Sequence, residues 1–337
     1  MAEIGLIEAE ADAVIDENAS VEGASDEGVG IKDDDSTASI TSSVCAREEY
    51  KGREYVNVKY EFYLLPIDDQ QQEAQDIIYY ALSLMLDGKL CLAPISSSPT
   101  RILDVGTGTG IWAIDMADEF PGTEVIGIDI APIQPVWVPP NLKFELDDAE
   151  LDWTFEPGSF DFVHLRCLHG SIKDWPKLYR QAFNALKPGG WLQHTEPDVQ
   201  MRSQTWGSTV DENHVFTKWA NLFEQVGSKT GRTFVFSSDR LKTLAEGARY
   251  SSIQLQTHNV PIGKWPLCKV HRDAGYSAEL GFEKGLDGYA KKPLCVVLDW
   301  TLEETQVLVA HMRRAIGDPR TQAIVRFFTV YAQKPLA

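Results

Sequence analysis

The sequence lacks the cysteine patterns that build disulfide frameworks or zinc sites. Its five cysteines stand singly, without a CxxC pair, at positions 45, 91, 167, 268 and 295. A scattered, odd-numbered set is typical of reduced thiols, so we expect an intracellular protein, cytoplasmic unless it serves a nuclear complex. HxxxH and HExxH motifs and compact acidic clusters are also lacking, so the sequence predicts no metal site.

Long apolar runs and an excess of positive charge are lacking as well. No apolar stretch reaches 18 residues, and no basic segment followed by an apolar run stands at the N-terminus, so we expect neither a membrane span nor a secretory signal. Among the 337 residues, 31 are Lys or Arg and 50 are Asp or Glu, which gives a net charge of -19. A chain of this charge cannot neutralise phosphates over a wide face, so direct binding of nucleic acid is not expected.

Much of the negative charge lies in the first 50 residues, which hold 14 acidic residues and 2 basic ones. Tyr50 is the only aromatic residue in this stretch. With so little apolar surface, residues 1–45 cannot offset the entropy of ordering, so we expect a disordered acidic tail. Such a tail serves either to keep the protein in solution or as a partner-binding or phosphorylated arm.

After residue 46 the chain alternates between helical and strand-like patterns. A helix is expected at 68–87, where Asp68 or Asp69 can cap the first turn and Gly88 can end the last one. Further elements follow, with helices at 111–120 and 175–186 and strands at 101–105, 124–128, 142–146, 160–165 and 190–195. This alternation predicts an α/β fold built on a parallel sheet with right-handed crossovers.

The pattern changes after Pro197. We expect a helix at 211–227, begun by Asp211, and then two more helices and two more strands. The later helices are expected at 268–290 and 302–316, and the strands at 252–260 and 325–331. Large aromatic residues in this part form a stripe that is either core or the wall of a ligand pocket. The stripe comprises Trp206, Phe216, Trp219, Phe223, Trp265 and Trp300.

The most informative segment is a strand that ends in three glycines, Gly106, Gly108 and Gly110, and is followed by a helix. Glycines allow a tight turn and a close approach of a ligand to the backbone. A dinucleotide fingerprint would have its third glycine where this sequence has Ile111, and Asp104 stands two residues before the first glycine. A carboxylate at that place suits a ligand with an ammonium group. We therefore favour S-adenosylmethionine over a nicotinamide dinucleotide or a purely structural turn.

More acidic residues follow at the ends of the next two strands. Asp129 comes 19 residues after Gly110, where a carboxylate can accept hydrogen bonds from both hydroxyls of a ribose. Asp147, Asp148 and Ala149 close the third strand. An acid there can accept from the amino group of adenine while a backbone N–H donates to the ring, and either aspartate can be that acid.

These stretches resemble the class I S-adenosylmethionine-dependent methyltransferases and, among them, the LaeA-like (TAM-domain) fungal family. The resemblance covers about residues 50–200 and the terminal 330–335, whereas 200–320, where a substrate would be chosen, match loosely. The matching stretches before residue 200 are 63–70, 86–90, 93–95, 101–115, 133–135, 137–141, 147–150, 170–176 and 186–191.

The resemblance implies a Rossmann-like class I fold with a seven-stranded, mostly parallel sheet whose last strand is antiparallel. It implies one domain over 46–337, with a helical N-terminal lid (46–98), a cofactor-binding core (99–200) and substrate-side helices with the last two strands (201–337). Lid elements are implied both in the N-terminal part, around Tyr63, and after the fifth strand. The implied cofactor contacts are Asp104, Gly106, Gly108, Gly110, Asp129, Asp148 and Ala149.

Methyl transfer from a sulfonium requires in-line positioning, and it requires a base only if the acceptor is a hydroxyl. His169 follows the fourth strand beside the expected methyl position and is a candidate base or orienting group. His194 and Glu196 of the fifth strand, and Asp198 after it, are further candidates that core packing would otherwise explain. Arg166 ends the fourth strand, where it can pair with a carboxylate of the site or hold an oxygen of the cofactor.

The sequence therefore predicts a methyltransferase that uses S-adenosylmethionine and acts on a small, fairly apolar secondary metabolite, with an oxygen acceptor favoured. The alternative is a LaeA-like regulator of gene clusters, in which the fold serves a nuclear complex and the acidic tail binds a protein partner. A third interpretation is a methyltransferase fold recruited to other chemistry, such as cyclisation.

Overall fold

A computed structural model describes residues 47–56, 63–205 and 211–336. The acidic tail expected at 1–45 lies outside the described residues, as does Trp206 of the aromatic stripe. Within the described ranges, no helix is both long enough and apolar enough to cross a membrane.

The described residues form an eight-stranded sheet, in which the order along the main path is β5-β4-β3-β6-β7-β10-β8, and β9 pairs with β10. Parallel pairing joins the first five strands of this path, and β10 is antiparallel to both β7 and β9. The strands are β3 (Arg101–Val105), β4 (Glu124–Asp129), β5 (Leu142–Leu146), β6 (Phe160–Arg166), β7 (Leu186–Pro197), β8 (Arg202–Ser203), β9 (Ser251–Pro261) and β10 (Ala323–Gln333). The expected parallel sheet with an antiparallel last strand is thus confirmed.

The sheet has one strand more than the seven that the resemblance implies. The additional strand is β8, which pairs with the first residues of β10, at Ala323 and Ile324. The strand β7 occupies the rest of that edge, up to the pair formed by Pro197 and Phe327. The short strand β8 therefore pairs with the same strand as β7, and it extends the pairing of β10 beyond the point where β7 ends.

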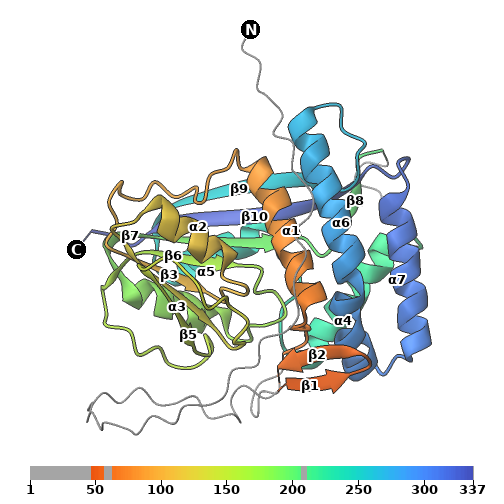
Figure 1. The fold of residues 1–337 in the computed structure, drawn as a ribbon, viewed down its shortest axis with the longest axis horizontal. Coiled ribbons are helices and arrows are strands. Elements are labelled where there is room, and N and C mark those ends of the chain that lie inside the picture. The colour runs from red at the N-terminus through yellow and green to blue at the C-terminus, as the bar shows by residue number, and fades with distance from the viewer. Residues whose placement is uncertain (1–46, 57–62, 206–210, 337) are drawn as a thin grey trace, which may run out of the picture. The chain divides into compact units, whose positions relative to one another are not determined.

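Helices cover both faces of the sheet (Figure 1). On one face, α3 (Trp175–Ala185) and α5 (Ser238–Gly247) pack against strand residues such as Leu103, Val163 and Leu192. On the other face, α2 (Ile111–Glu119) packs Trp112 and its neighbours against β3, β4 and β6. The helix α5 is absent from the sequence-based expectation, although Ser237 accepts a hydrogen bond from the backbone N–H of Arg240 as a standard N-cap.

Four longer helices form a layer of their own beside the sheet (Figure 1). They are α1 (Asp69–Met85), α4 (Val215–Thr230), α6 (Lys269–Lys292) and α7 (Leu302–Gly317). The helix α6 continues into a short π-helical segment, η1 (Pro293–Val297). As expected, Asp68 caps α1, and Gly88 (φ 72°) follows it in the left-handed conformation. The expected start of α4 at Asp211 is wrong. His214 is the N-cap instead, because its Nδ1 accepts from the backbone N–H of Phe216, while Asp211 holds a turn that precedes the helix.

The helix α1 packs against α6 at positions where α6 has glycines. A Cβ on Gly281 would come within 2.8 Å of Ile78 Cγ1, and one on Gly285 within 3.2 Å of Ala74 Cβ. A Cβ on Gly288 would overlap the side chain of Gln71. The side chains of α1 therefore pack directly on the backbone of α6. This contact places the inner face of α1 over the carboxyl ends of the strands.

A two-stranded hairpin precedes α1, formed by β1 (Arg47–Tyr50) and β2 (Arg53–Val56), in a part expected to be helical. Arg53 is buried, with 5% of its side chain exposed. Its Nε and Nη2 donate to the carboxylate of Asp68 over 2.6 and 2.8 Å, and its Nη1 donates to Asp287 Oδ2 over 3.0 Å. One guanidinium therefore joins the hairpin, the start of α1 and the end of α6.

We expect Arg53→Ala to lower the free energy of unfolding by about 3 kcal/mol, because it leaves the largely buried Asp68 without its cation and leaves Asp287 with Lys291 alone. The matched control is Arg47→Ala, which removes the exposed pair with Glu54 on the same hairpin and is expected to change stability by less than about 1 kcal/mol. Urea unfolding followed by circular dichroism measures both. Equal effects of the two substitutions would contradict the role given to Arg53.

Candidate active site

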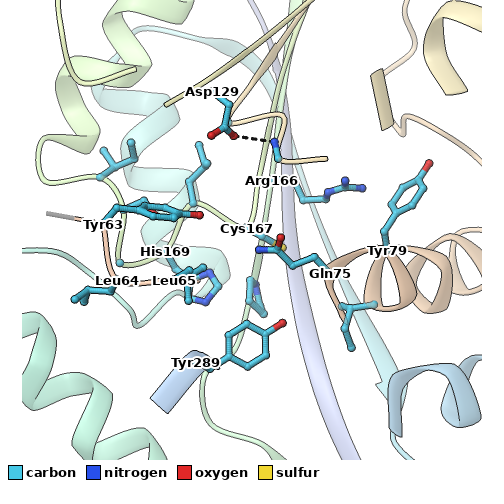
Figure 2. A pocket seen from close by; sticks show the side chains of 18 of the residues that line it. Tyr63, Leu64, Leu65, Gln75, Tyr79, Asp129, Arg166, Cys167, His169 and Tyr289 are labelled. Atoms are coloured by element: carbon cyan, nitrogen blue, oxygen red, sulfur yellow. Dashed lines mark hydrogen bonds between the residues drawn. The ribbon is translucent and has the colours of Figure 1, made fainter. Parts of the chain in front are cut away.

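A cavity of about 240 Å3 opens at the carboxyl ends of β3, β4 and β6. Residues of α1, α4 and α6 form its opposite wall. In the view of Figure 2, Asp129 and Tyr289 lie at opposite ends, with Tyr63, Cys167 and His169 between them. Open α/β sheets bind ligands at this edge, so the cavity is the candidate site.

The glycine loop connects β3 to α2 along one side of the cavity. Gly106, Gly108 and Gly110 all have positive φ, at 68°, 60° and 83°, which explains why the sequence has glycine at each of them. Gly106 and Gly108 line the cavity, whereas Gly110 does not. Gly110 is the N-cap of α2, and a Cβ there would overlap the ring of Phe144. Two of the three glycines therefore present backbone to the cavity, and the third shapes the turn.

Asp104 lies beneath this loop, 3% exposed, and lines the cavity. Its Oδ2 accepts a hydrogen bond from Thr107 Oγ1 (2.6 Å), and its Oδ1 lies 2.8 Å from His164 Nδ1. His164 is fixed in turn by stacking on Trp112, with ring centroids 3.7 Å apart. The carboxylate expected to face an ammonium group thus also ties the loop to the neighbouring strand β6.

Asp129 ends β4, and its carboxylate accepts two backbone N–H groups. Gly108 donates to Oδ2 over 2.8 Å (Figure 2), and Ala131 donates to Oδ1 over 2.9 Å. Burial raises the pKa of Asp129 to about 6, although these hydrogen bonds oppose the shift. The glycine loop and the end of β4 are therefore held together by a carboxylate that ionises near neutral pH.

The corner after β5 contributes Asp147, Asp148 and Ala149, and all three line the cavity. The backbone N–H of Asp148 donates to Asp147 Oδ1, and the backbone N–H of Glu150 donates to Asp148 Oδ1, each over 2.8 Å. Burial raises the pKa of Asp147. Each carboxylate keeps a second oxygen, so both aspartates remain candidates for the adenine contact.

Tyr63 and Arg166 lie on the wall formed with the N-terminal part of the chain. Both line the cavity, and the Arg166 guanidinium sits 4.3 Å from the ring centroid of Tyr79 on α1. This cation–π contact leaves the polar edge of the guanidinium for an anionic group. Burial and the nearby Asp129 raise the pKa of Tyr63, so its hydroxyl stays protonated and can donate.

His169 enters the cavity from the loop after β6, and Glu196 holds it there. Its Nδ1 lies 3.0 Å from Glu196 Oε2, and that oxygen also accepts the backbone N–H of His169 over 3.1 Å. The other oxygen, Oε1, accepts the backbone N–H of Leu168 over 2.7 Å. The chain turns sharply just before, at Cys167, whose φ is 54°. Burial and the charge of Glu196 raise the pKa of Cys167 to about 12, so this thiol is not a nucleophile at neutral pH.

Glu196 and His194 lie behind the cavity wall rather than in it. Both side chains have 0% exposure, and neither lines the cavity. Burial alone would raise the pKa of Glu196, but hydrogen bonds from His169 and His194 lower it to about 2. Asp198 does line the cavity, but its carboxylate is paired with Arg326 and Arg202. Of the candidates for chemistry, His169 alone combines exposure to the cavity with a side chain held by a buried carboxylate.

The end of the cavity away from the glycine loop is apolar. Two members of the aromatic stripe, Trp219 and Phe223, line it and are nearly buried, whereas Phe216 lies in the core. Residues that the sequence interpretation missed also line the cavity, and they come from connectors, from α1 and α6, and from β10. They are Gln75, Met201, Phe234, Phe282, Tyr289 and Phe327.

Comparison with known proteins gives the same family from independent grounds. A family model described as "Methyltransferase domain" matches residues 77–254. "Methyltransferase pytC" of Aspergillus terreus is 35% identical over 305 residues, which cover 90% of this chain and 93% of that protein. "Secondary metabolism regulator LAE1" of Cochliobolus heterostrophus is 34% identical, covering 84% and 94% of the two chains. "Protein-methionine methyltransferase laeA" of Emericella nidulans is 31% identical, covering 86% and 76%.

These relatives match nearly the whole described part of the chain, and the family model spans the glycine loop and the carboxylates around it. The sheet order and the antiparallel last strand agree with that assignment. The chain belongs to the LaeA-like family of fungal methyltransferases, which use S-adenosylmethionine.

Proposed function

We propose that the protein methylates a hydroxyl of a small, largely apolar secondary metabolite. The observation that carries this proposal is the division of one cavity into two chemically different ends, with His169 between them. Glycine backbone and carboxylates line one end, and large aromatic side chains line the other. An apolar pocket with a few placed polar groups is the usual form of a small-molecule site.

The residues present fit S-adenosylmethionine. Asp129 is fixed by two backbone N–H groups with lone pairs left to accept from ribose hydroxyls, and Asp147 or Asp148 would accept from adenine. Asp104 and the backbone at Gly106 would meet the amino acid part, with Arg166 near its carboxylate. Tyr63 would cover the cofactor from the N-terminal side. When bound, the cofactor supplies an electrophilic methyl group and leaves as a neutral thioether.

For a hydroxyl acceptor, the protein must also remove a proton. The Nδ1–H of His169 donates to Glu196, which leaves Nε2 as the ring nitrogen that accepts the hydroxyl proton. The aromatic end orients the acceptor and excludes water, so the acceptor oxygen meets the methyl group rather than solvent. General-base assistance of this kind typically contributes 10²- to 10⁴-fold to the rate.

A second candidate is methylation of a methionine side chain within a regulatory protein complex. It is favoured by the similarity to LAE1 and laeA, whose names describe a regulator and a protein-methionine methyltransferase. The acidic tail would then be the arm that binds a protein partner. A thioether has no proton to lose, so this reaction has no use for the base at His169. The two candidates therefore differ in their dependence on His169.

Deletion of the gene in its host tests the function directly. We expect accumulation of a metabolite that is one methyl group lighter than the normal product, measured by mass spectrometry. The purified protein is expected to convert that compound with S-adenosylmethionine. Tail-dependent capture of partners by the full chain but not by residues 46–337, without any change in methylated metabolites, would favour the regulatory candidate instead.

We expect Asp129→Asn to weaken the binding of S-adenosylhomocysteine by about ten- to a hundredfold, because a charged acceptor for two hydroxyls is lost. Isothermal titration calorimetry measures the change. The control is Asp152→Asn, which alters an exposed carboxylate (94% exposed) away from the cavity. Equal affinity of wild type and Asp129→Asn would contradict the assignment of Asp129.

The raised pKa of Asp129 predicts that cofactor binding depends on pH. Asp129 is ionised above a pKa of about 6 and protonated below it, so the affinity for S-adenosylhomocysteine should fall as the pH is lowered through this value. Between pH 7.5 and pH 5 we expect a loss of about tenfold in the wild type. The affinity of Asp129→Asn should stay nearly constant over the same range, and a parallel loss in both proteins would assign the titration to another group.

We expect His169→Gln to lower kcat by about 10²-fold or more with a hydroxyl acceptor, while the affinity for S-adenosylhomocysteine stays within about twofold. Glutamine keeps a side-chain N–H that can donate to Glu196 but offers no ring nitrogen as a base. Initial rates with the accumulated metabolite and calorimetry provide the two readouts. Full activity of His169→Gln would remove the base from the mechanism and favour the thioether acceptor.

A further inference from the structure

A chain of four polar side chains runs from the interior of the protein to the cavity. Tyr179 of α3 lies with its hydroxyl 2.7 Å from His194 Nδ1. His194 Nε2 lies 2.8 Å from Glu196 Oε1, and Glu196 Oε2 lies 3.0 Å from His169 Nδ1. The first three side chains are fully buried. His169 is 23% exposed and reaches the cavity.

The proton positions in this chain follow from the partners. Glu196 is ionised and can only accept, so both histidines donate to it, His194 from Nε2 and His169 from Nδ1. Burial raises the pKa of Tyr179, so its hydroxyl keeps a proton, and among the described residues His194 Nδ1 is the partner found to accept it. His169 then carries its proton on Nδ1, with Nε2 toward the cavity.

Aromatic packing fixes the middle of the chain. The His194 ring is stacked on Trp175, with centroids 4.9 Å apart and an angle of 20° between the planes. Phe236 contacts the same ring edge-on at 5.8 Å. From the part of the chain that the structure describes, Glu196 accepts four N–H groups, two from side chains and two from the backbone of the loop that carries His169. Apolar side chains of the same volume would stabilise this core at least as well as a buried charge, so core stability does not explain the chain.

We propose that His194 and Tyr179 are positioning residues for methyl transfer. They fix the carboxylate of Glu196, and through it they hold His169 in the tautomer whose Nε2 faces the acceptor. The Tyr179 hydroxyl selects the tautomer of His194, the His194 Nε2–H orients Glu196, and Glu196 orients both the ring and the backbone of His169. This inference rests on the proposed role of His169 as the base, and neither positioning residue touches a substrate.

The deciding experiment observes the tautomer of His169 rather than activity. The full chain is labelled with ¹⁵N in histidine, and long-range ¹H–¹⁵N correlation spectra are recorded with S-adenosylhomocysteine present. Signals of His169 and His194 are assigned from the spectra of His169→Gln and His194→Gln. In the wild type we expect one tautomer for each, with the proton on Nδ1 of His169 and on Nε2 of His194.

His194→Phe keeps the ring and its stacking but removes both hydrogen bonds. We expect a second tautomer of His169 to appear, and kcat with the accumulated metabolite to fall by about 10²-fold at nearly unchanged KM. His194→Gln, whose amide can still donate to Glu196, should recover most of kcat. Tyr179→Phe should give a smaller loss in the same direction, which keeps the test available if His194→Phe does not fold.

The matched control is Tyr250→Phe, which removes a buried hydroxyl beside Tyr179 that has no hydrogen-bond partner among the described residues and is not part of the chain. It should leave the His169 tautomer and kcat unchanged. A mixture of tautomers in the wild type, or a single unchanged tautomer in both His194→Phe and Tyr179→Phe, would overturn the proposal. If the tautomer responds as expected while His169→Gln retains full activity, the base assignment fails and the orienting chain stands only as a structural device.

Discussion

The site depends on buried carboxylates that accept backbone N–H groups from the loop after a neighbouring strand. Asp129 at the end of β4 fixes the glycine loop after β3 through Gly108. Glu196 at the end of β7 fixes the loop after β6 through Leu168 and His169. Loops at this edge of a parallel sheet leave N–H groups without strand partners, and a carboxylate one strand away satisfies them with charge-assisted hydrogen bonds. The two halves of the cavity are built by the same device.

The two carboxylates differ in what surrounds them, and this difference separates binding from proton transfer. Asp129 is held mainly by backbone, and burial raises its pKa to about 6. Glu196 also receives two imidazoles, which lower its pKa to about 2 despite complete burial. Asp129 thus titrates near pH 6, while Glu196 keeps its charge well below that pH. A constant charge is what an orienting partner of a histidine requires.

The sheet and the cofactor end were predictable from the sequence, whereas the acceptor end was not. The strands before residue 200 and the glycine loop carry local signals, namely apolar runs, positive-φ glycines and acids at strand ends. Tyr289, Phe234 and Gln75 reach the cavity only through the packing of α1, α4 and α6, which depends on contacts between residues about 200 positions apart. The position of His194 relative to the cavity was likewise not predictable from the sequence. Its place in the strand was expected, but burial and partners decide that it lies behind the site.

The glycines of α6 that face α1 have a consequence for how this protein can diversify. A glycine at a helix seam can only be replaced by something larger, and the side chains of α1 leave no room for it at Gly281 or Gly288. The aromatic residues on α4 line the cavity, so a smaller side chain there would enlarge the cavity and leave the seam unchanged. Adaptation to a new acceptor would therefore proceed by substitutions at Trp219 and Phe223, while the glycines at the contact between α1 and α6 are retained.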